Sequence, residues 1–103
     1  MKIAVSSKGA GLGAWIEPSL KSCGFLVVVD DNFKFVAIEN KGNTTDMTNQ
    51  AIGEGIEALV AGTLDDEIIE LLKGSDIKIF IAQQGSILEL VEQVNNGNLM
   101  RLG

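Results

Sequence analysis

The sequence contains no histidine and no tyrosine, and it has only one cysteine and one proline among 103 residues. The lack of histidine excludes Ser-His-Asp and Cys-His nucleophilic sites as well as histidine-ligated zinc. The single cysteine, Cys23, cannot form an internal disulfide, which is typical of a reducing compartment. Any catalysis would depend on carboxylates, lysines, hydroxyls and one thiol, so we expect a protein that binds something rather than an enzyme.

Basic residues are also scarce, with eight lysines and arginines against 14 acidic residues and a net charge of −6. Such a surface repels phosphate backbones and anionic lipids, so we expect neither a nucleic-acid partner nor a membrane partner. The longest unbroken apolar runs, such as Phe25–Val29, are too short to span a bilayer. The first residues also lack the features of a secretory signal, so we expect a cytoplasmic protein.

Apolar residues are abundant, at 46%, although only 5% of the residues are aromatic. Valine, isoleucine, leucine and alanine must therefore fill the core. Such interiors are typical of a β-sheet that helices cover on both faces. The length fits one domain that comprises residues 1–103.

Hydrophobic periodicity divides the chain into strands and helices. Five strands are predicted, at Lys2–Ser6, Phe25–Asp30, Phe33–Glu39, Glu57–Ala61 and Ile77–Ala82. Three helices are predicted, one from Thr44 to about Gly53, one from Leu64 to Gly74, and one from Ile87 to about Asn95. The residues Asp31-Asn32 are expected to form a tight hairpin turn, and Ala14–Gly24, which shows no steady period, is expected to be irregular.

The predicted order β-β-β-α-β-α-β-α indicates a mixed sheet of α/β class. Helical crossovers make the first, fourth and fifth strands parallel, and the second strand runs antiparallel to its neighbours. The expected spatial order is 3-2-1-4-5, which resembles the ribonuclease-H-like architecture. Two helix starts have side-chain signals: Ser86 and Glu89 fit a capping box, and Thr63 with Asp66 fits a shorter version.

In open α/β sheets, ligands bind beyond the carboxyl ends of the parallel strands. Three loops should meet there, at 6–13, 62–63 and 83–86, and each brings glycine with hydroxyl or amide side chains. We therefore expect a shallow polar pocket for an anionic or oxygen-rich ligand; its predicted residues are Ser7, Gly9, Gly62, Thr63 and Gln84. The alternative is that these are ordinary α/β loops without a ligand.

Cys23 lies between Ser22 and Gly24, close to Lys21 and just before the second strand. A partly exposed thiol of lowered pKa at this place could ligate a soft metal or a cluster, with Lys21 and Ser22 beside it. The alternative is a small buried residue at the entrance of the strand, which is how most lone cysteines behave.

The segment Pro18–Asp30, Pro-Ser-Leu-Lys-Ser-Cys-Gly-Phe-Leu-Val-Val-Val-Asp, resembles the signature of the dinitrogenase iron–molybdenum cofactor biosynthesis family. Pro18, Cys23 and Asp30 coincide with a proline, a cysteine and an aspartate of that signature. The segment 55–62 and the closing Val91–Leu99 are also similar to the family, so the resemblance covers nearly the whole chain. The arginine that the family carries in the signature is replaced by Ser22.

The resemblance implies a ribonuclease-H-like fold without the residues of a nuclease. It also implies a non-catalytic accessory protein that carries an iron–molybdenum cofactor or an iron–sulfur cluster as its precursor. Cys23 would be the one metal ligand from the chain, with Ser22, Thr63 and glycine amides as hydrogen-bond donors. The second hypothesis is a cofactor-free interaction or regulatory module, which would use Trp15 or the exposed edge Phe33–Glu39 to bind a protein partner or to form a homodimer.

Overall fold

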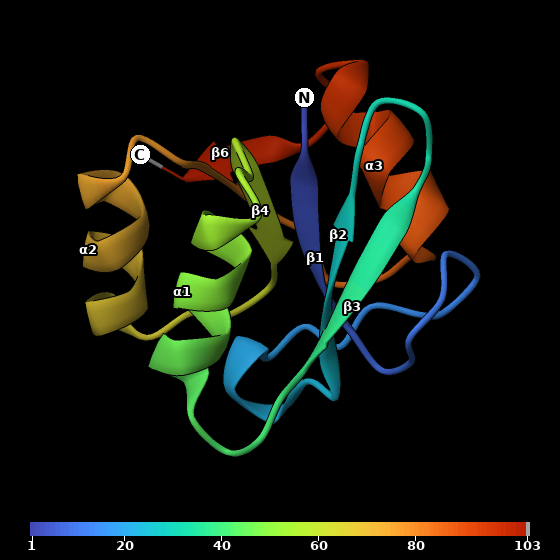
Figure 1. The fold of residues 1–103 in the computed structure, drawn as a ribbon. Coiled ribbons are helices and arrows are strands. Elements are labelled where there is room, and N and C mark those ends of the chain that lie inside the picture. Colours follow the sequence, from blue (N-terminus) through green and yellow to red (C-terminus); the bar gives the residue numbers. More distant parts are fainter. Residues whose placement is uncertain (103) are drawn as a thin grey trace.

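The computed structural model describes residues 1–102 and contains a single six-stranded sheet (Figure 1). The strands are β1 (Ile3–Ser7), β2 (Phe25–Val29), β3 (Phe35–Glu39), β4 (Ala58–Ala61), β5 (Lys78–Ile81) and β6 (Met100–Leu102). The α-helices are α1 (Thr44–Gly53), α2 (Asp66–Gly74) and α3 (Ile87–Asn95), and a short 3₁₀ helix, η1, spans Leu20–Ser22.

The spatial order of the strands is β3-β2-β1-β4-β5-β6. The predicted order of the first five strands, their directions and the three helices are confirmed: β1, β4 and β5 are parallel, and β2 is antiparallel to both neighbours. The predicted number of five strands is wrong, because β6 pairs antiparallel with β5. This strand has only three residues, with Arg101 in the middle, so it lacks a hydrophobic pattern of its own. The likeness to ribonuclease H stays a prediction.

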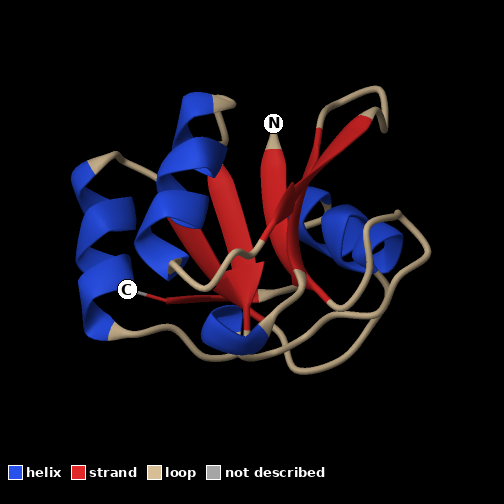
Figure 2. Ribbon diagram, turned by 60° about the horizontal axis from the view of Figure 1, so that its bottom comes forward, coloured by secondary structure: helices blue, strands red, loops and turns tan. Residues whose placement is uncertain are grey.

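The helices cover the two faces of the sheet, with α1 and α2 on one face and α3 on the other (Figure 2). Alternation along β4 shows how one strand serves both layers. Leu59 packs in the core with Met47 and Leu72, and its neighbour Val60 packs on the opposite side with Leu90 of α3. Among the helices of residues 1–102, none is long and apolar enough to cross a membrane.

The hairpin between β2 and β3 has a longer turn than Asp31-Asn32. The Asp30 amide donates to the Lys34 carbonyl at 2.9 Å, and the Phe33 amide donates to the Asp30 carbonyl at 3.1 Å. Phe33 adopts the left-handed conformation, with φ of 60°. The Asp30 carboxylate stabilises this longer turn, because it accepts hydrogen bonds from the amides of Asn32 and Lys34.

One of the two predicted side-chain caps is confirmed. Ser86 and Glu89 form a complete capping box at the start of α3. The cap predicted at Thr63 is wrong, because α2 begins at Asp66, and its N-cap, Asp65, makes no side-chain capping bond. Thr63 is held elsewhere through its backbone, which bonds to the irregular segment that follows β1.

Candidate functional site

The chain between β1 and β2 crosses the carboxyl ends of the parallel strands, where the ligand pocket was predicted. Three isolated bridges anchor this covering segment, residues 14–24: Ser7 pairs with Ile16, Trp15 with Ser86, and Ser19 with Thr63. In Figure 1 it is the blue chain below the sheet. The segment therefore touches the end of β1, the loop after β4 and the start of α3.

Three apolar side chains hold the covering segment in place. Ile16, Leu20 and Cys23 are each at most 2% exposed, and they pack in the two cores on either side of the sheet. This stretch has no steady period in the sequence, which predicts an irregular segment, although the i, i+4, i+7 spacing of these three residues indicates a buried side. The two cores therefore hold the covering segment in place as an integral part of the fold.

The covering segment also occupies backbone amides in the loop after β4 and at the start of α3, where the sequence predicts a pocket for an anionic ligand. The amides of Gly62 and Thr63 both donate to the Pro18 carbonyl, at 2.7 and 2.9 Å. At the start of α3, the Ile87 amide donates to the Ala14 carbonyl at 2.9 Å. Carbonyl oxygens of the same chain thus occupy the positions where a ligand would accept these bonds.

Cys23 lies inside the core, 2% exposed, as a free thiol. Burial raises the pKa of the Cys23 thiol to about 11, although a hydrogen bond from the Ser7 backbone opposes the rise, and the nearby carboxylate of Glu17 adds to it. Metals bind the thiolate, and a thiol of this pKa is protonated at neutral pH. In this conformation Cys23 fits the alternative interpretation, a small buried residue at the strand entrance, and does not fit a metal ligand.

The other predicted site residues divide into exposed and buried ones. Lys21, Ser22 and Thr63 are exposed and lie near one another, because Ser19 pairs with Thr63 and its hydroxyl lies 3.4 Å from that of Ser22. Ser7, by contrast, is fully buried, and its hydroxyl donates to the Gly9 carbonyl at 2.6 Å.

The two remaining glycines and Gln84 lie against the covering segment. A Cβ at Gly62 would stand 2.8 Å from that of Pro18, and one at Gly9 would stand 3.2 Å from that of Ala14. Gln84 is exposed beside Gly85, whose carbonyl accepts a bond from the Ile16 amide. Gly9 and Gly62 therefore contribute to the scaffold at the carboxyl ends of the parallel strands, which we call the rim. The exposed donors at the rim are Lys21, Ser22, Thr63 and Gln84.

The described part of the chain contains no metal site built from several protein ligands. Within residues 1–102, no three histidine, cysteine, aspartate or glutamate side chains come close enough to hold a metal ion. A metal centre bound here would have to bring its own ligands.

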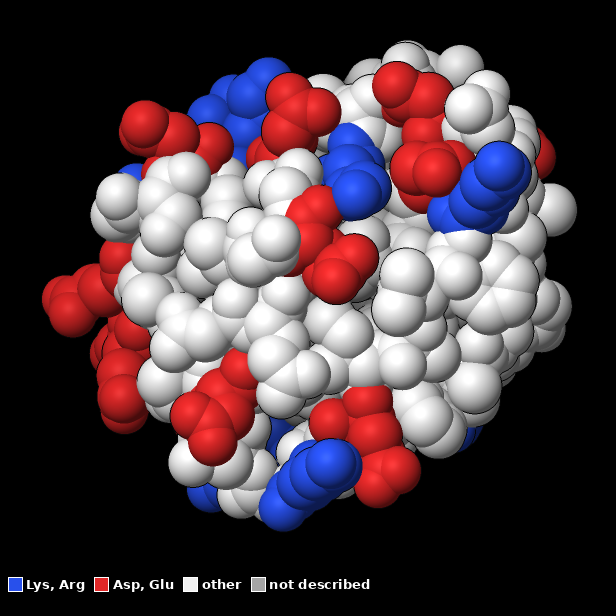
Figure 3. All heavy atoms as spheres, viewed as in Figure 1, with Lys and Arg blue, Asp and Glu red and all other residues white. Residues whose placement is uncertain are grey.

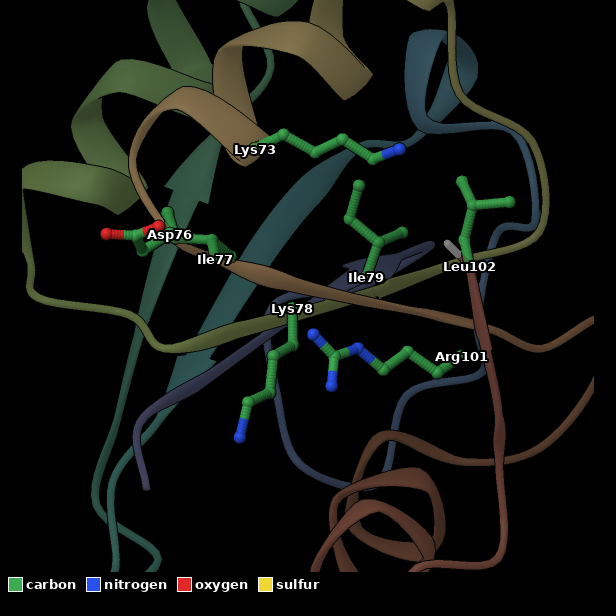
Figure 4. A pocket seen from close by; sticks show the side chains of 7 residues that line it. All are labelled: Lys73, Asp76, Ile77, Lys78, Ile79, Arg101 and Leu102. Carbon is green, nitrogen blue, oxygen red and sulfur yellow. The ribbon is translucent and has the colours of Figure 1, made fainter.

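Two surface hollows lie away from the predicted rim. The first, about 320 Å³, is formed by the end of α2 with β5 and β6, and Lys73, Lys78 and Arg101 line it (Figure 4). The figure shows Lys73 on the same side of the sheet as Ile79, whereas Lys78 and Arg101 point to the other side. The three cations therefore do not converge on one ligand. The second hollow, about 590 Å³, lies between β3 and α1.

Solved structures show which fold this is. The apo form of the orange protein from Desulfovibrio gigas superposes with a TM-score of 0.89 at 20% identity, covering 99% of this chain and 92% of that one. A candidate NifB protein from Thermotoga gives 0.85 at 20% identity, covering 98% and 92%. A candidate dinitrogenase from Methanocaldococcus jannaschii gives 0.77 at 19% identity, covering 100% and 95%. At these identities the likeness establishes a common fold.

A search of curated proteins gave no match. A family model, by contrast, matches nearly the whole sequence, from residue 1 to residue 97, and its description is dinitrogenase iron-molybdenum cofactor. The match includes the predicted signature at Pro18–Asp30 and confirms the resemblance. The chain therefore belongs to the dinitrogenase iron–molybdenum cofactor family.

Proposed function

We propose that this protein is a non-catalytic accessory protein that holds an iron–molybdenum cofactor or an iron–sulfur precursor of it. The family match over residues 1–97 carries the proposal. The similarity to a protein whose structure is described as an apo form supports a ligand-binding role for this fold. The absence of histidine supports a role without nucleophilic catalysis.

The residues support a ligand that is bound by hydrogen bonds and by charge, without coordinate bonds between protein side chains and the metal. Cys23 is buried and protonated, and no group of three ligating side chains exists within residues 1–102. A cluster that arrives with its own sulfide ligands needs no thiolate from the protein. It needs donors, because its sulfides accept hydrogen bonds and its total charge is negative.

We place the ligand on the outer side of the covering segment, where Lys21, Ser22 and Thr63 are exposed together. Lys21 supplies positive charge and the two hydroxyls supply donors. Asp65 and Asp66 lie close to Thr63 in the sequence and oppose an anion, so we expect weak binding that serves transfer better than storage.

Anaerobic loading tests this function. The protein is dialysed to equilibrium without oxygen against ferrous iron, molybdate and sulfide, and then measured for bound metal and visible absorbance. The wild type should retain metal above the level of an unrelated protein of equal net charge. Equal retention by the two proteins would overturn the proposed function.

Three variants test the mode of binding. Lys21→Glu should lower the retained metal several-fold, whereas Lys73→Glu, the same change of charge at a distant hollow, should leave it unchanged. Cys23→Ala should keep full loading. A Cys23→Ala protein that folds normally and loses its metal would show that the core opens and the thiol ligates after all.

A further inference from the structure

The two edges of the sheet differ in how they are protected against pairing with another chain. At the edge formed by β6, the strand has three residues and places Arg101 at its centre. At the other edge, β3 has five residues, contains no proline, and carries a charge only at its last residue, Glu39. Short edge strands and edge charges prevent association, so β3 is the unprotected edge.

Hydrogen bonds at both ends of the β2–β3 ladder determine which backbone groups of β3 face outward. The Asp30 amide donates to the Lys34 carbonyl at 2.9 Å, and the Asn40 amide donates to the Gly24 carbonyl at 2.9 Å. These are the hydrogen-bonded pairs of the antiparallel register, and such pairs alternate along the ladder. Even-numbered residues of β3 therefore bond to β2.

The odd-numbered residues Phe35, Ala37 and Glu39 consequently direct their amide and carbonyl groups away from the sheet. The described chain pairs β3 with β2 alone, so these groups are available to another strand. These three alternate residues could form hydrogen bonds with an incoming strand, which is enough for a short ladder.

Apolar side chains accompany these free backbone groups. Phe35 is 45% exposed and Val36 is 49% exposed. The hollow of about 590 Å³ runs beside the strand. Val36, Ala37 and Ile38 of β3 line it, together with Gln50, Gly53 and the charged residues Glu39, Lys41 and Glu54. Figure 3 shows an uncharged area over the middle of β3 on this face. The edge therefore offers free hydrogen-bonding groups and two exposed apolar side chains, Phe35 and Val36.

We propose that β3 pairs antiparallel with β3 of a second copy of this chain, about a two-fold axis at Ala37. In this register, Val36 lies opposite Ile38 of the second copy. Because Ile38 lines the hollow, Val36 of each copy covers the hollow of the other. The contact is thus self-complementary, as a two-fold interface requires, and the two sheets become continuous.

Charge at the ends of β3 favours this antiparallel arrangement. Lys34 precedes β3, and Glu39 is its last residue. Antiparallel pairing brings the Lys34 end of one copy to the Glu39 end of the other. Parallel pairing would bring like charges together at both ends, where they would repel each other.

The interface is small, because it consists of one strand and the side chains beside it. Interfaces below about 1,200 Å² in total associate transiently. We therefore expect a dimer that forms at protein concentrations on the order of 100 μM. This association needs no cofactor, so it does not depend on the proposed function.

Sedimentation equilibrium over a wide concentration range tests the dimer with three variants. In Ala37→Pro, the lost amide faces outward, so the bonds to β2 remain, as edge strands permit for proline. Val36→Glu places a carboxylate in the contact at a half-exposed position, which leaves the core intact. Met100→Glu is the control, since it adds the same charge to the other edge at a residue that is 74% exposed.

The wild type and Met100→Glu should rise in mass from one chain to two as concentration rises, and Ala37→Pro and Val36→Glu should stay at one chain. Thermal unfolding shows that each variant is folded, and Val36→Glu keeps the test valid if Ala37→Pro unfolds. Amide exchange at Phe35, Ala37 and Glu39 should slow with concentration. A wild type that remains a monomer at millimolar concentration, or a dimer unchanged by Val36→Glu, would overturn the proposal.

Discussion

Pro18 and Gly62 fit against each other without space for one more carbon atom. The Gly62 amide donates to the Pro18 carbonyl at 2.7 Å, and a Cβ at position 62 would lie 2.8 Å from the Pro18 Cβ. It would also lie 2.9 Å from the Ala82 carbonyl oxygen. Because both of these neighbours are backbone or ring atoms, a side chain at position 62 would push the covering segment away from the loop after β4.

Gly62→Ala should therefore lower the free energy of unfolding by about 1–3 kcal/mol, the usual cost of an added methyl group in a packed site. Urea denaturation followed by circular dichroism measures the change. Gly11→Ala is the control, since a Cβ there meets nothing within 4 Å and should change stability by less than about 0.5 kcal/mol. Equal stability of Gly62→Ala and the wild type would mean that the covering segment moves aside easily.

The two predicted caps give opposite expectations for the same kind of mutation. Ser86 accepts a bond from the Glu89 amide at 3.2 Å, so Ser86→Ala should cost about 1 kcal/mol. Thr63 caps no helix and its side chain is exposed, so Thr63→Ala should change the free energy of unfolding by less than about 0.5 kcal/mol. Thermal denaturation of both variants checks this. A larger loss of stability in Thr63→Ala would show that the Thr63 side chain caps α2, as the sequence predicts.

The elements that the sequence predicted correctly are those whose residues interact with near neighbours in the chain. The helix α3 is an example, because its apolar spacing and its Ser86–Glu89 cap are both local signals. The strand β6 was missed since three residues with a central arginine carry no pattern, and only its pairing with β5 makes it a strand.

The candidate site was harder to predict for a related reason. The amides of Gly62 and Thr63 are used by Pro18, a residue more than 40 positions away, through backbone atoms that every residue has. The amino-acid sequence therefore gives no indication of such backbone hydrogen bonds. The burial of Cys23 likewise depends on how the covering segment lies on the sheet, whereas its neighbours Lys21 and Ser22 are exposed.

The thiol of Cys23 should make stability depend on pH in the alkaline range. Its folded-state pKa is raised from an ordinary value of 9.0 to about 11, so the folded state holds this proton more tightly than the unfolded state. The resulting stabilisation is present below pH 9 and is lost as the pH rises towards 11. The loss for one proton is at most about 1.4 kcal/mol per pH unit.

Urea denaturation at pH 8 and pH 10.5 measures this effect, with Cys23→Ala as the reference that removes the thiol. The wild type should lose more stability than the variant over this range. Its thiol should also react slowly with a disulfide reagent at pH 8 in the folded state and rapidly in urea. Fast reaction without denaturant would show that the covering segment opens, and would make Cys23 available to a metal.

The backbone conformation of Phe33 at the hairpin turn destabilises the folded state. Its φ of 60° lies in the left-handed region, where a residue with a Cβ is less stable by about 1–2 kcal/mol. The ring is 44% exposed, so its burial offsets only part of this cost. Phe33→Gly removes the steric conflict, although glycine also gives the unfolded chain more freedom. We expect a net gain of roughly 0.5–1 kcal/mol in the free energy of unfolding.

Asn32→Gly is the matched control, because Asn32 is the neighbouring turn residue and has no positive φ. It should lower stability slightly, since glycine adds unfolded-state freedom there and relieves no conflict. Both variants are measured by urea denaturation at about 10 μM protein, well below the concentration at which we expect β3 to pair. A loss of stability in Phe33→Gly would mean that the ring packs on the sheet more strongly than its exposure indicates, and the edge of β3 would then depend on this aromatic contact.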